Sequence, residues 1–374
     1  MSSARLRVAV LGAGTVGREV VRALLDRPDE LRPAEGATLE LTAIAIRDVD
    51  RGVRAGLPPA MLSDAPAHHV ADEGIDVIVE LMGGDEPAHT LIAAALSMGK
   101  HVVTANKHVI AHHGPELEAI SRRTGATLRF EAAVGGGIPV LGPLARDLAA
   151  NRVRRVRGIV NGTTNFILSA MTDETQPLEY AAALAEAQRL GYAETDPSGD
   201  VEGLDAANKL VILARLAFDR WLDPATIPTR PDGADGPAGP GITTVSLADQ
   251  ADARRAGRIM RLLATASLDD AGGIAAAVLP TALPLDSALG RTAGVRNRIE
   301  VDATPVGRIG FDGPGAGGAA TSSAVLGDLL AIARGEGSTW GPRRPATTPA
   351  AGGVSRPDGE VFVASSGVRY PIDD

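Results

Sequence analysis

Short apolar runs alternate with amphipathic stretches along the first 130 residues of this chain. The apolar runs lie at residues 6–11, 39–46, 76–81, 101–104 and 128–130. Stretches with helical periodicity lie between them, at 16–25, 87–98 and 115–123. Short apolar runs bounded by turn residues indicate buried strands. Strict alternation of strand and helix predicts an α/β fold with a Rossmann-type, doubly wound parallel sheet.

The pattern changes after the glycines at 135–137. A predicted strand at 153–160 is followed by predicted helices at 163–171, 178–190, 204–218 and 247–266, with a Pro/Gly-rich segment at 224–240. Further predicted strands lie at 274–279, 298–302 and 306–311. This mixture predicts a second, α+β domain. A last helix is predicted at 321–333, and the residues beyond it, rich in Pro, Gly, Thr and Ser, indicate a linker or surface extension.

Composition and charge narrow the class of protein. The chain has 374 residues, is 44% hydrophobic and carries a formal net charge of −9, which argues against nucleic-acid and anionic-membrane partners. The basic run at 152–157 contains no aromatic residue and fits a partly exposed strand. No cysteine is present, which excludes disulfides and fits a reducing compartment. The apolar runs are too short to span a membrane, so we expect a cytoplasmic enzyme.

A glycine fingerprint joins the first predicted strand to the first helix. It reads Gly12-Ala-Gly14-Thr15-Val16-Gly17. Gly12 permits the tight turn, Gly14 lets the backbone approach a pyrophosphate, and Gly17 lets the helix pack closely on the strand. The amides of Thr15 and Val16 open the helix and suit phosphate oxygens. The position between strand and helix favours dinucleotide binding over a plain glycine turn.

The second predicted strand ends at Arg47 and Asp48, where the cofactor ribose is expected. An acid there favours the free hydroxyls of NAD, and an arginine favours the phosphate of NADP. Both are present, so NAD and NADP stay open, with a lean to NADP because Arg47 directly follows the strand. The two residues would also fit an ordinary solvated ion pair.

Lysine is rare in this chain: Lys100, Lys107 and Lys209 stand among 37 lysines and arginines. Arginine serves at a solvated surface but does not release a proton at working pH. Asp205 and Lys209 are four residues apart on a predicted helix, so their side chains share one face. This spacing fits an exposed ion pair or, if desolvated, a proton donor for a carbonyl group that accepts hydride. Lys100 is expected at the surface.

Several sequence blocks closely resemble the homoserine dehydrogenase family, over about residues 5–335 and in the family's order. They are Val102-Val-Thr104-Ala-Asn-Lys107, Glu131-Ala-Ala-Val-Gly-Gly-Gly-Ile138, Asn161-Gly-Thr-Thr-Asn165, Gly203-Leu-Asp-Ala-Ala-Asn-Lys209 and Gly313-Pro-Gly-Ala-Gly-Gly318. The resemblance implies interconversion of L-aspartate 4-semialdehyde and L-homoserine with NAD or NADP, in threonine, methionine and isoleucine biosynthesis.

The resemblance also implies roles for individual residues in the substrate half. Lys209 would transfer the proton and Asp205 would orient it. Glu194 would bind the substrate ammonium, with Asp200 close by. Gly162 and Thr163, at the start of a helix, would hold the substrate oxygens. Other acids in this stretch, such as Glu202 and Asp196, fit a solvated loop.

In the cofactor half, the resemblance places Lys107 between cofactor and substrate as a second candidate for charge stabilisation or proton transfer. Thr104 and Gly317 would approach the cofactor. The family's monovalent-cation site, for an ion such as sodium, corresponds to Glu131, Val134, Gly136 and Ile138. The seven histidines include adjacent pairs, which point apart, and no HExxH motif, so we expect no transition-metal site.

We therefore expect a discontinuous dinucleotide-binding domain formed by residues 1–140 and 312–335. Residues 141–311 would form the substrate-binding and dimerisation domain of a homodimer, and 336–374 a Pro/Gly-rich extension. Longer family members carry a C-terminal regulatory ACT module; the stretch after residue 334 is expected to be too short for one. The alternatives are a Rossmann dehydrogenase for a related amino acid and a non-catalytic nucleotide-binding regulator.

Overall fold

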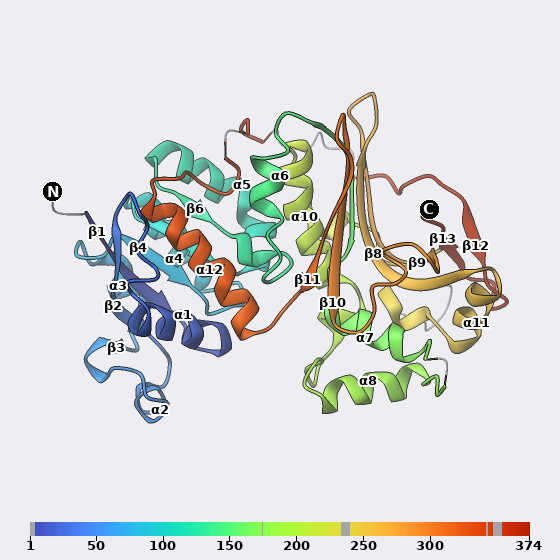
Figure 1. The fold of residues 1–374 in the computed structure, drawn as a ribbon, viewed down its shortest axis with the longest axis horizontal. Helices are drawn as coiled ribbons and strands as arrows, with labels where there is room; N and C mark the ends of the chain where they lie inside the picture. Colours follow the sequence, from blue (N-terminus) through green and yellow to red (C-terminus); the bar gives the residue numbers. More distant parts are fainter. Residues whose placement is uncertain (1–3, 174, 233–239, 342, 347–353) are drawn as a thin grey trace. The chain divides into compact units, whose positions relative to one another are not determined.

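The computed structural model describes residues 4–173, 175–232, 240–341, 343–346 and 354–374. The chain forms two compact units, each built from two segments (Figure 1). Unit 1 comprises Met1–Asp147 and Ala316–Ala346, and unit 2 comprises Leu148–Gly315 and Thr347–Asp374.

Unit 1 is built on a six-stranded sheet in the order β3-β2-β1-β4-β5-β6, with every pair of neighbours parallel. Its strands are β1 (Arg5–Leu11), β2 (Thr38–Ala45), β3 (Leu62–Ser63), β4 (Val77–Glu80), β5 (His101–Thr104) and β6 (Leu128–Arg129). The strand order reverses between β1 and β4, which is where doubly wound sheets bind ligands. The predicted Rossmann-type fold is confirmed.

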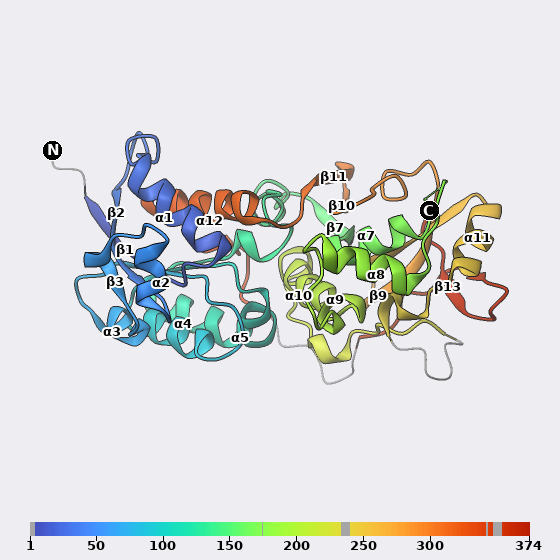
Figure 2. The same cartoon turned by 90° about the horizontal axis from the view of Figure 1, so that it is seen from below.

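Helices cover both faces of this sheet. Figure 2 shows α1 and α12 on one side and α3, α4 and α5 on the other. The helices are α1 (Thr15–Asp26), α2 (Val49–Arg54), α3 (Pro66–Ala71), α4 (Ala88–Ser97), α5 (Lys107–Thr124), α6 (Leu141–Ala145) and α12 (Gly318–Ala333), with short 3-10 turns η1 (Pro59–Met61) and η2 (Glu131–Ala133). One apolar core joins β1, α1 and α12 through residues such as Val10, Val20 and Leu329.

Helix α5 begins much earlier than the predicted stretch at 115–123. It starts at Lys107, because the side chain of Asn106 accepts a hydrogen bond from the Val109 amide and caps the helix. Pro115 lies inside the helix and has no amide hydrogen for the preceding turn. Proline and the polar histidines before it hid the first turns from the periodicity.

Unit 2 is built on an antiparallel sheet in the order β11-β10-β7-β8-β9. Its strands are β7 (Arg152–Ile159), β8 (Arg258–Leu268), β9 (Ile274–Pro284), β10 (Arg296–Thr304) and β11 (Gly307–Pro314). Its helices are α7 (Gly162–Ala170), α8 (Tyr180–Arg189), α9 (Ser198–Val201), α10 (Leu204–Phe218) and α11 (Leu247–Arg255), with 3-10 turns η3 (Pro224–Thr226) and η4 (Gly241–Thr244). Residues 233–239 of the predicted Pro/Gly-rich segment lie outside the described residues.

The prediction of a single helix at 247–266 is wrong. Helix α11 ends at Arg255, Gly257 turns the chain with φ of 73°, and β8 begins at Arg258. The residues of β8 between Met260 and Ala264 are all buried, so polar and apolar positions do not alternate along this part of the strand. A buried stretch without such alternation cannot be assigned to strand or helix from periodicity alone.

The expected surface extension at 336–374 also differs from the structure in its described residues; residues 342 and 347–353 lie outside them. Trp340, in unit 1, is only 3% exposed and packs near Phe130, with ring centroids 5.9 Å apart. In unit 2, β12 (Val361–Val363) and β13 (Arg369–Pro371) pair with each other, and Tyr370 is fully buried. A few large side chains among prolines and glycines anchor this segment without producing a periodic pattern.

The basic run at 152–157 forms most of β7, at the centre of the unit 2 sheet. Arg155 pairs with Asp302 at 2.8 Å, and the almost fully buried Arg157 pairs with Glu300 at 3.1 Å. These two arginines are therefore paired with acids of the neighbouring strand β10, and Arg154 pairs with Asp270 in the turn after β8. None of the helices in the described residues is long and apolar enough to cross a membrane.

Lys100 is not the surface residue that we expected. Its side chain is buried, and its Nζ donates to the carbonyl oxygens of Asp72 and Ile75, at 2.6 Å each. The ammonium ties the residue before β5 to the loop before β4. Lys100 has a structural role.

Candidate active site

The glycine fingerprint forms the turn between β1 and α1 in unit 1. Gly12 has φ of 101°, and a Cβ there would lie 2.6 Å from the carbonyl oxygen of Leu81. A Cβ on Gly17 would lie 2.0 Å from the carbonyl oxygen of Gly12. Gly14, in contrast, faces open space, because a Cβ at this position would have no neighbouring atom within 4 Å. The backbone therefore leaves room at the position where a pyrophosphate is expected to approach.

The first turn of α1 offers amide donors to this space. The first intrahelical bond runs from Arg18 N to Gly14 O, at 3.0 Å, so the preceding amides in the turn have no intrahelical partner. The start of α12 lies beside this turn, because a Cβ on Gly318 would lie 3.0 Å from the carbonyl oxygen of Thr15. Gly317, with φ of 112°, opens α12 at this place. These features fit an anion such as a pyrophosphate.

Arg47 and Asp48 follow β2 and have different environments. The Asp48 carboxylate caps α2 by accepting a hydrogen bond from the Arg51 amide, at 2.8 Å. Arg47 is exposed and makes no hydrogen bond or ion pair with any residue in the described parts of the chain. The Asp48 carboxylate is therefore engaged as a helix cap, whereas the Arg47 guanidinium is available to a ligand.

A buried carboxyl group organises the carboxyl-terminal ends of the adjacent strands β4 and β5. Glu80 ends β4 and accepts hydrogen bonds from the Met82 amide at 2.8 Å and the Thr104 hydroxyl at 2.6 Å. Burial raises the pKa of Glu80, and the hydrogen bond from Thr104 opposes this shift. Thr104 itself is fully buried, and its hydroxyl also accepts from the Asn106 amide. Thr104 thus connects the end of β4 to the chain after β5 through buried hydrogen bonds. Lys107 follows as the first residue of α5.

In unit 2, a polar cluster forms where β7 meets α7 and α10; we call Asn161, Asp200, Asp205 and Lys209 the acid–lysine cluster. The Lys209 Nζ donates to Asp205 Oδ2 and to the carbonyl oxygen of Val160, both at 2.7 Å. The side chains of Lys209 and Asp205 are 11% and 9% exposed. An exposed ion pair, the alternative reading of this spacing, does not describe this desolvated pair.

Asn161 holds the cluster together. Its Nδ2 donates to Asp200 Oδ1 at 2.7 Å and to Asp205 Oδ2 at 2.8 Å. Its Oδ1 accepts from the Thr164 amide at 2.8 Å, which caps α7. One buried amide therefore fixes the start of a helix and two carboxylates.

The start of α7 is packed closely against its surroundings. A Cβ on Gly162 would lie 2.9 Å from the Val295 carbonyl oxygen. The Thr163 hydroxyl donates to the Tyr192 carbonyl oxygen at 2.6 Å, which brings the loop after α8 to this place. Glu194 lies on that loop with an exposed side chain, and within the described chain it makes no hydrogen bond or ion pair to the acid–lysine cluster.

Sequence reasoning did not assign roles to Asn161 and Glu80. Glu80 is the last residue of a buried strand, and Asn161 stands between the end of β7 and the start of α7, which is the signature of an N-cap. That signal identifies the cap, but only the fold brings the amide to Asp200 and Asp205.

The predicted cation-site residue Glu131 uses its carboxylate elsewhere. It accepts from the amides of Val140 and Leu141 at 2.8 Å and from Gly142 at 2.7 Å, at the start of α6. Burial, and then the neighbouring Asp328 carboxylate, raise the pKa of Glu131 to about 6. Its carboxylate is therefore committed to the protein.

Comparisons with known proteins agree with this architecture. The family model described as homoserine dehydrogenase matches residues 139–330, and the one described as its NAD binding domain matches residues 12–131. The homoserine dehydrogenase of Corynebacterium glutamicum is 43% identical over 331 residues, which cover 87% of this chain and 72% of the relative. That of Bacillus subtilis is 38% identical, with coverage of 87% and 72%.

Solved structures give the same result. A homoserine dehydrogenase from Thiobacillus denitrificans superposes with a TM-score of 0.83 at 36% identity, covering 92% of this chain and 79% of that one. A hyperthermophilic archaeal homoserine dehydrogenase in complex with NADPH superposes with a TM-score of 0.69 at 27% identity, covering 87% and 97%. The chain belongs to the homoserine dehydrogenase family.

Proposed function

We propose that this homoserine dehydrogenase interconverts L-aspartate 4-semialdehyde and L-homoserine with Lys209 as the proton donor and acceptor. The observation that carries the assignment is the desolvated pair of Lys209 and Asp205. A bound nicotinamide cofactor supplies hydride to the aldehyde carbon, or takes it from the alcohol carbon. The protein must then supply or accept a proton at the oxygen on that carbon.

Lys209 is suited to this task by its surroundings. Two oxygen acceptors, on Asp205 and Val160, hold its Nζ in one position. In the reductive direction the ammonium donates a proton to the substrate oxygen, and in the oxidative direction the amine accepts it. Arginine would keep the charge but not the proton transfer.

The remaining parts of unit 2 bind the substrate in this proposal. The amides at the start of α7, at Gly162 and Thr163, suit the oxygens of the amino acid. The exposed carboxylate of Glu194 suits its ammonium group, and Asp200, fixed by Asn161, adds negative charge near Lys209. Lys107 remains the second candidate for proton transfer or charge stabilisation.

NADP is the preferred cofactor in this proposal. Asp48 is occupied as a helix cap and Arg47 is exposed, which favours a ribose phosphate over a free ribose hydroxyl. The solved archaeal relative is in complex with NADPH. Unit 1 would hold the cofactor and unit 2 the substrate.

Three further expectations belong to the same proposal. The chain forms a homodimer and acts in the cytoplasm. Sedimentation of the purified protein tests the oligomeric state. A sodium ion binds through main-chain carbonyl oxygens at Glu131, Val134, Gly136 and Ile138, since the Glu131 carboxylate is engaged. Replacing sodium by choline should then lower activity.

The decisive experiment compares Lys209→Arg with Lys107→Arg. Purified parent protein should oxidise L-homoserine as NADP is reduced. Lys209→Arg should lose at least about a hundredfold in kcat, the lower range for a lost general acid or base, while NADPH binding measured by fluorescence is unchanged. Loss in Lys107→Arg alone would transfer the role to Lys107. Cofactor binding by the parent without turnover would favour a nucleotide-binding regulator.

A further inference from the structure

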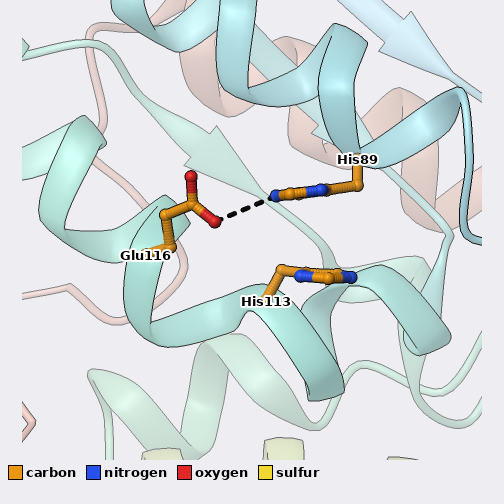
Figure 3. A group of neighbouring side chains, drawn as sticks. All are labelled: His89, His113 and Glu116. Carbon is orange, nitrogen blue, oxygen red and sulfur yellow. Dashed lines mark hydrogen bonds and ion pairs between the residues drawn. The ribbon is translucent and has the colours of Figure 1, made fainter.

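Histidines and acids gather at the start of α4 and along α5 in unit 1. His89 comes from α4, and His113 and Glu116 come from α5. One ring nitrogen of each histidine and one carboxylate oxygen of Glu116 lie within 4.8 Å of one another (Figure 3). These residues belong to neither the glycine turn nor the acid–lysine cluster.

Each histidine has a carboxylate other than that of Glu116 on one ring nitrogen. The Nδ1 of His89 lies 3.2 Å from Glu86, and the Nε2 of His113 lies 2.8 Å from Asp85. Metal-binding histidines commonly carry such an outer carboxylate, which fixes the ring and its tautomer. The contacts leave Nε2 of His89 and Nδ1 of His113 for a ligand, and Nε2 of His89 already meets Glu116 at 3.0 Å.

The geometry allows a metal after one adjustment. The rings of His89 and His113 stack, with centroids 3.7 Å apart and planes at 11°. Because the nitrogen lone pairs lie in the ring planes, one ring must turn before both nitrogens point at one ion. Their side chains are 19% and 27% exposed and that of Glu116 is 55% exposed, so water can reach the site and complete the coordination.

More ligands of the same kind lie close by. His108 Nε2 is 3.7 Å from Asp85, and the His108 ring stacks on that of His112, with centroids 4.2 Å apart. His108 and His112 are four residues apart on α5, a spacing that places two imidazoles on one helix face. Our expectation of no transition-metal site overlooked this spacing and the approach of His89 from α4.

We propose that His89, His113 and Glu116 bind a divalent transition-metal ion of the zinc class, with Asp85 and Glu86 as its outer carboxylate partners. Two imidazole nitrogens and one carboxylate oxygen are a typical donor set for Zn²⁺ and Co²⁺. The ion links the start of α4 to the middle of α5. Its bound state should therefore stabilise unit 1 without taking part in hydride transfer.

The test uses Co²⁺ as a spectroscopic probe and Zn²⁺ as its competitor. Near neutral pH, the full chain should take up one equivalent of Co²⁺ with visible absorption bands, and Zn²⁺ should remove them. His89→Ala and His113→Ala should abolish the bands, and Asp85→Asn should weaken Co²⁺ about tenfold or more. His68→Ala, at an exposed histidine of α3, is the matched control and should bind like the parent.

Three results would overturn the assignment. They are no uptake at millimolar Co²⁺, uptake that survives His89→Ala with His113→Ala, and uptake lost only in His108→Ala with His112→Ala. Circular dichroism of each metal-free variant shows whether it is folded, and Glu116→Gln, at an exposed position, keeps the comparison available if a histidine variant unfolds. Glu116→Gln should weaken Co²⁺ at unchanged stability of the metal-free protein.

Discussion

Replacing Asn161 by aspartate should strongly destabilise unit 2. The substitution keeps the size of the side chain and the oxygen that caps α7, but it exchanges the donor to Asp200 and Asp205 for a third negative oxygen. Each lost hydrogen bond to a charged group contributes about 1.5–3 kcal/mol. The two together amount to about 3–6 kcal/mol of the free energy of unfolding.

The size of this effect should depend on pH in a definite direction. In Asn161→Asp, three close carboxyl groups raise the folded pKa of at least one of them above its unfolded value. Such a group destabilises the fold above its folded pKa and ceases to do so below its unfolded pKa. The difference in stability between parent and variant should therefore shrink as the pH falls from about 8 to about 5.

Thermal unfolding measures this difference. The loss of about 3 kcal/mol or more corresponds to a fall in melting temperature of at least about 6 °C for a unit of this size. Asn161→Ser is the control, because serine still caps a helix but adds no charge, so its deficit should change less with pH. An Asn161→Asp variant that melts at the parent's temperature near pH 8 would refute the hydrogen-bonding scheme.

Other parts of the structure give further predictions. Between pH about 4.5 and about 7, the free energy of unfolding of the parent relative to Glu131→Gln should fall by about 2 kcal/mol, because the folded pKa of Glu131 is raised to about 6. Denaturant titrations in which the difference in unfolding free energy does not change with pH would contradict this. Arg47→Ala should raise KM for NADPH about tenfold in steady-state assays and leave KM for NADH unchanged; equal effects would reject a phosphate contact. Gly12→Ala should lower both the melting temperature and the affinity for NADPH, since its Cβ would lie 2.6 Å from the Leu81 carbonyl oxygen. Gly14→Ala should lower the affinity alone. A Gly12→Ala variant with the parent's melting temperature and NADPH affinity would contradict the close contact at Gly12.

Local patterns predicted the parts of the fold that local physics determines. The alternation of apolar runs and helices identified the parallel sheet, and the fingerprint from Gly12 to Gly17 identified its turn, because short-range sterics control both. The same reasoning failed at β8, whose mostly buried residues carry no period, and at Tyr370, whose packing is set by residues far away in sequence.

The candidate site divides in the same way. The spacing of Asp205 and Lys209 predicted a shared helix face, which their 2.7 Å contact bears out. Burial of this pair, and the amide of Asn161 that reaches across from α7, depend on how α7 and α10 pack. Lys100 was expected at the surface and is buried instead. The carbonyl groups that its ammonium contacts have no signature in the sequence.

Because unit 1 is assembled from the first 147 residues and a late stretch, Ala316–Ala346, it cannot be completed while the ribosome is still translating the middle of the message. The hydrophobic surface of α1 stays uncovered until Val325 and Leu329 of α12 are synthesised, a little over three hundred codons later. During that interval the nascent chain exposes apolar side chains, so premature termination before α12 should yield an aggregating fragment instead of a working nucleotide-binding half.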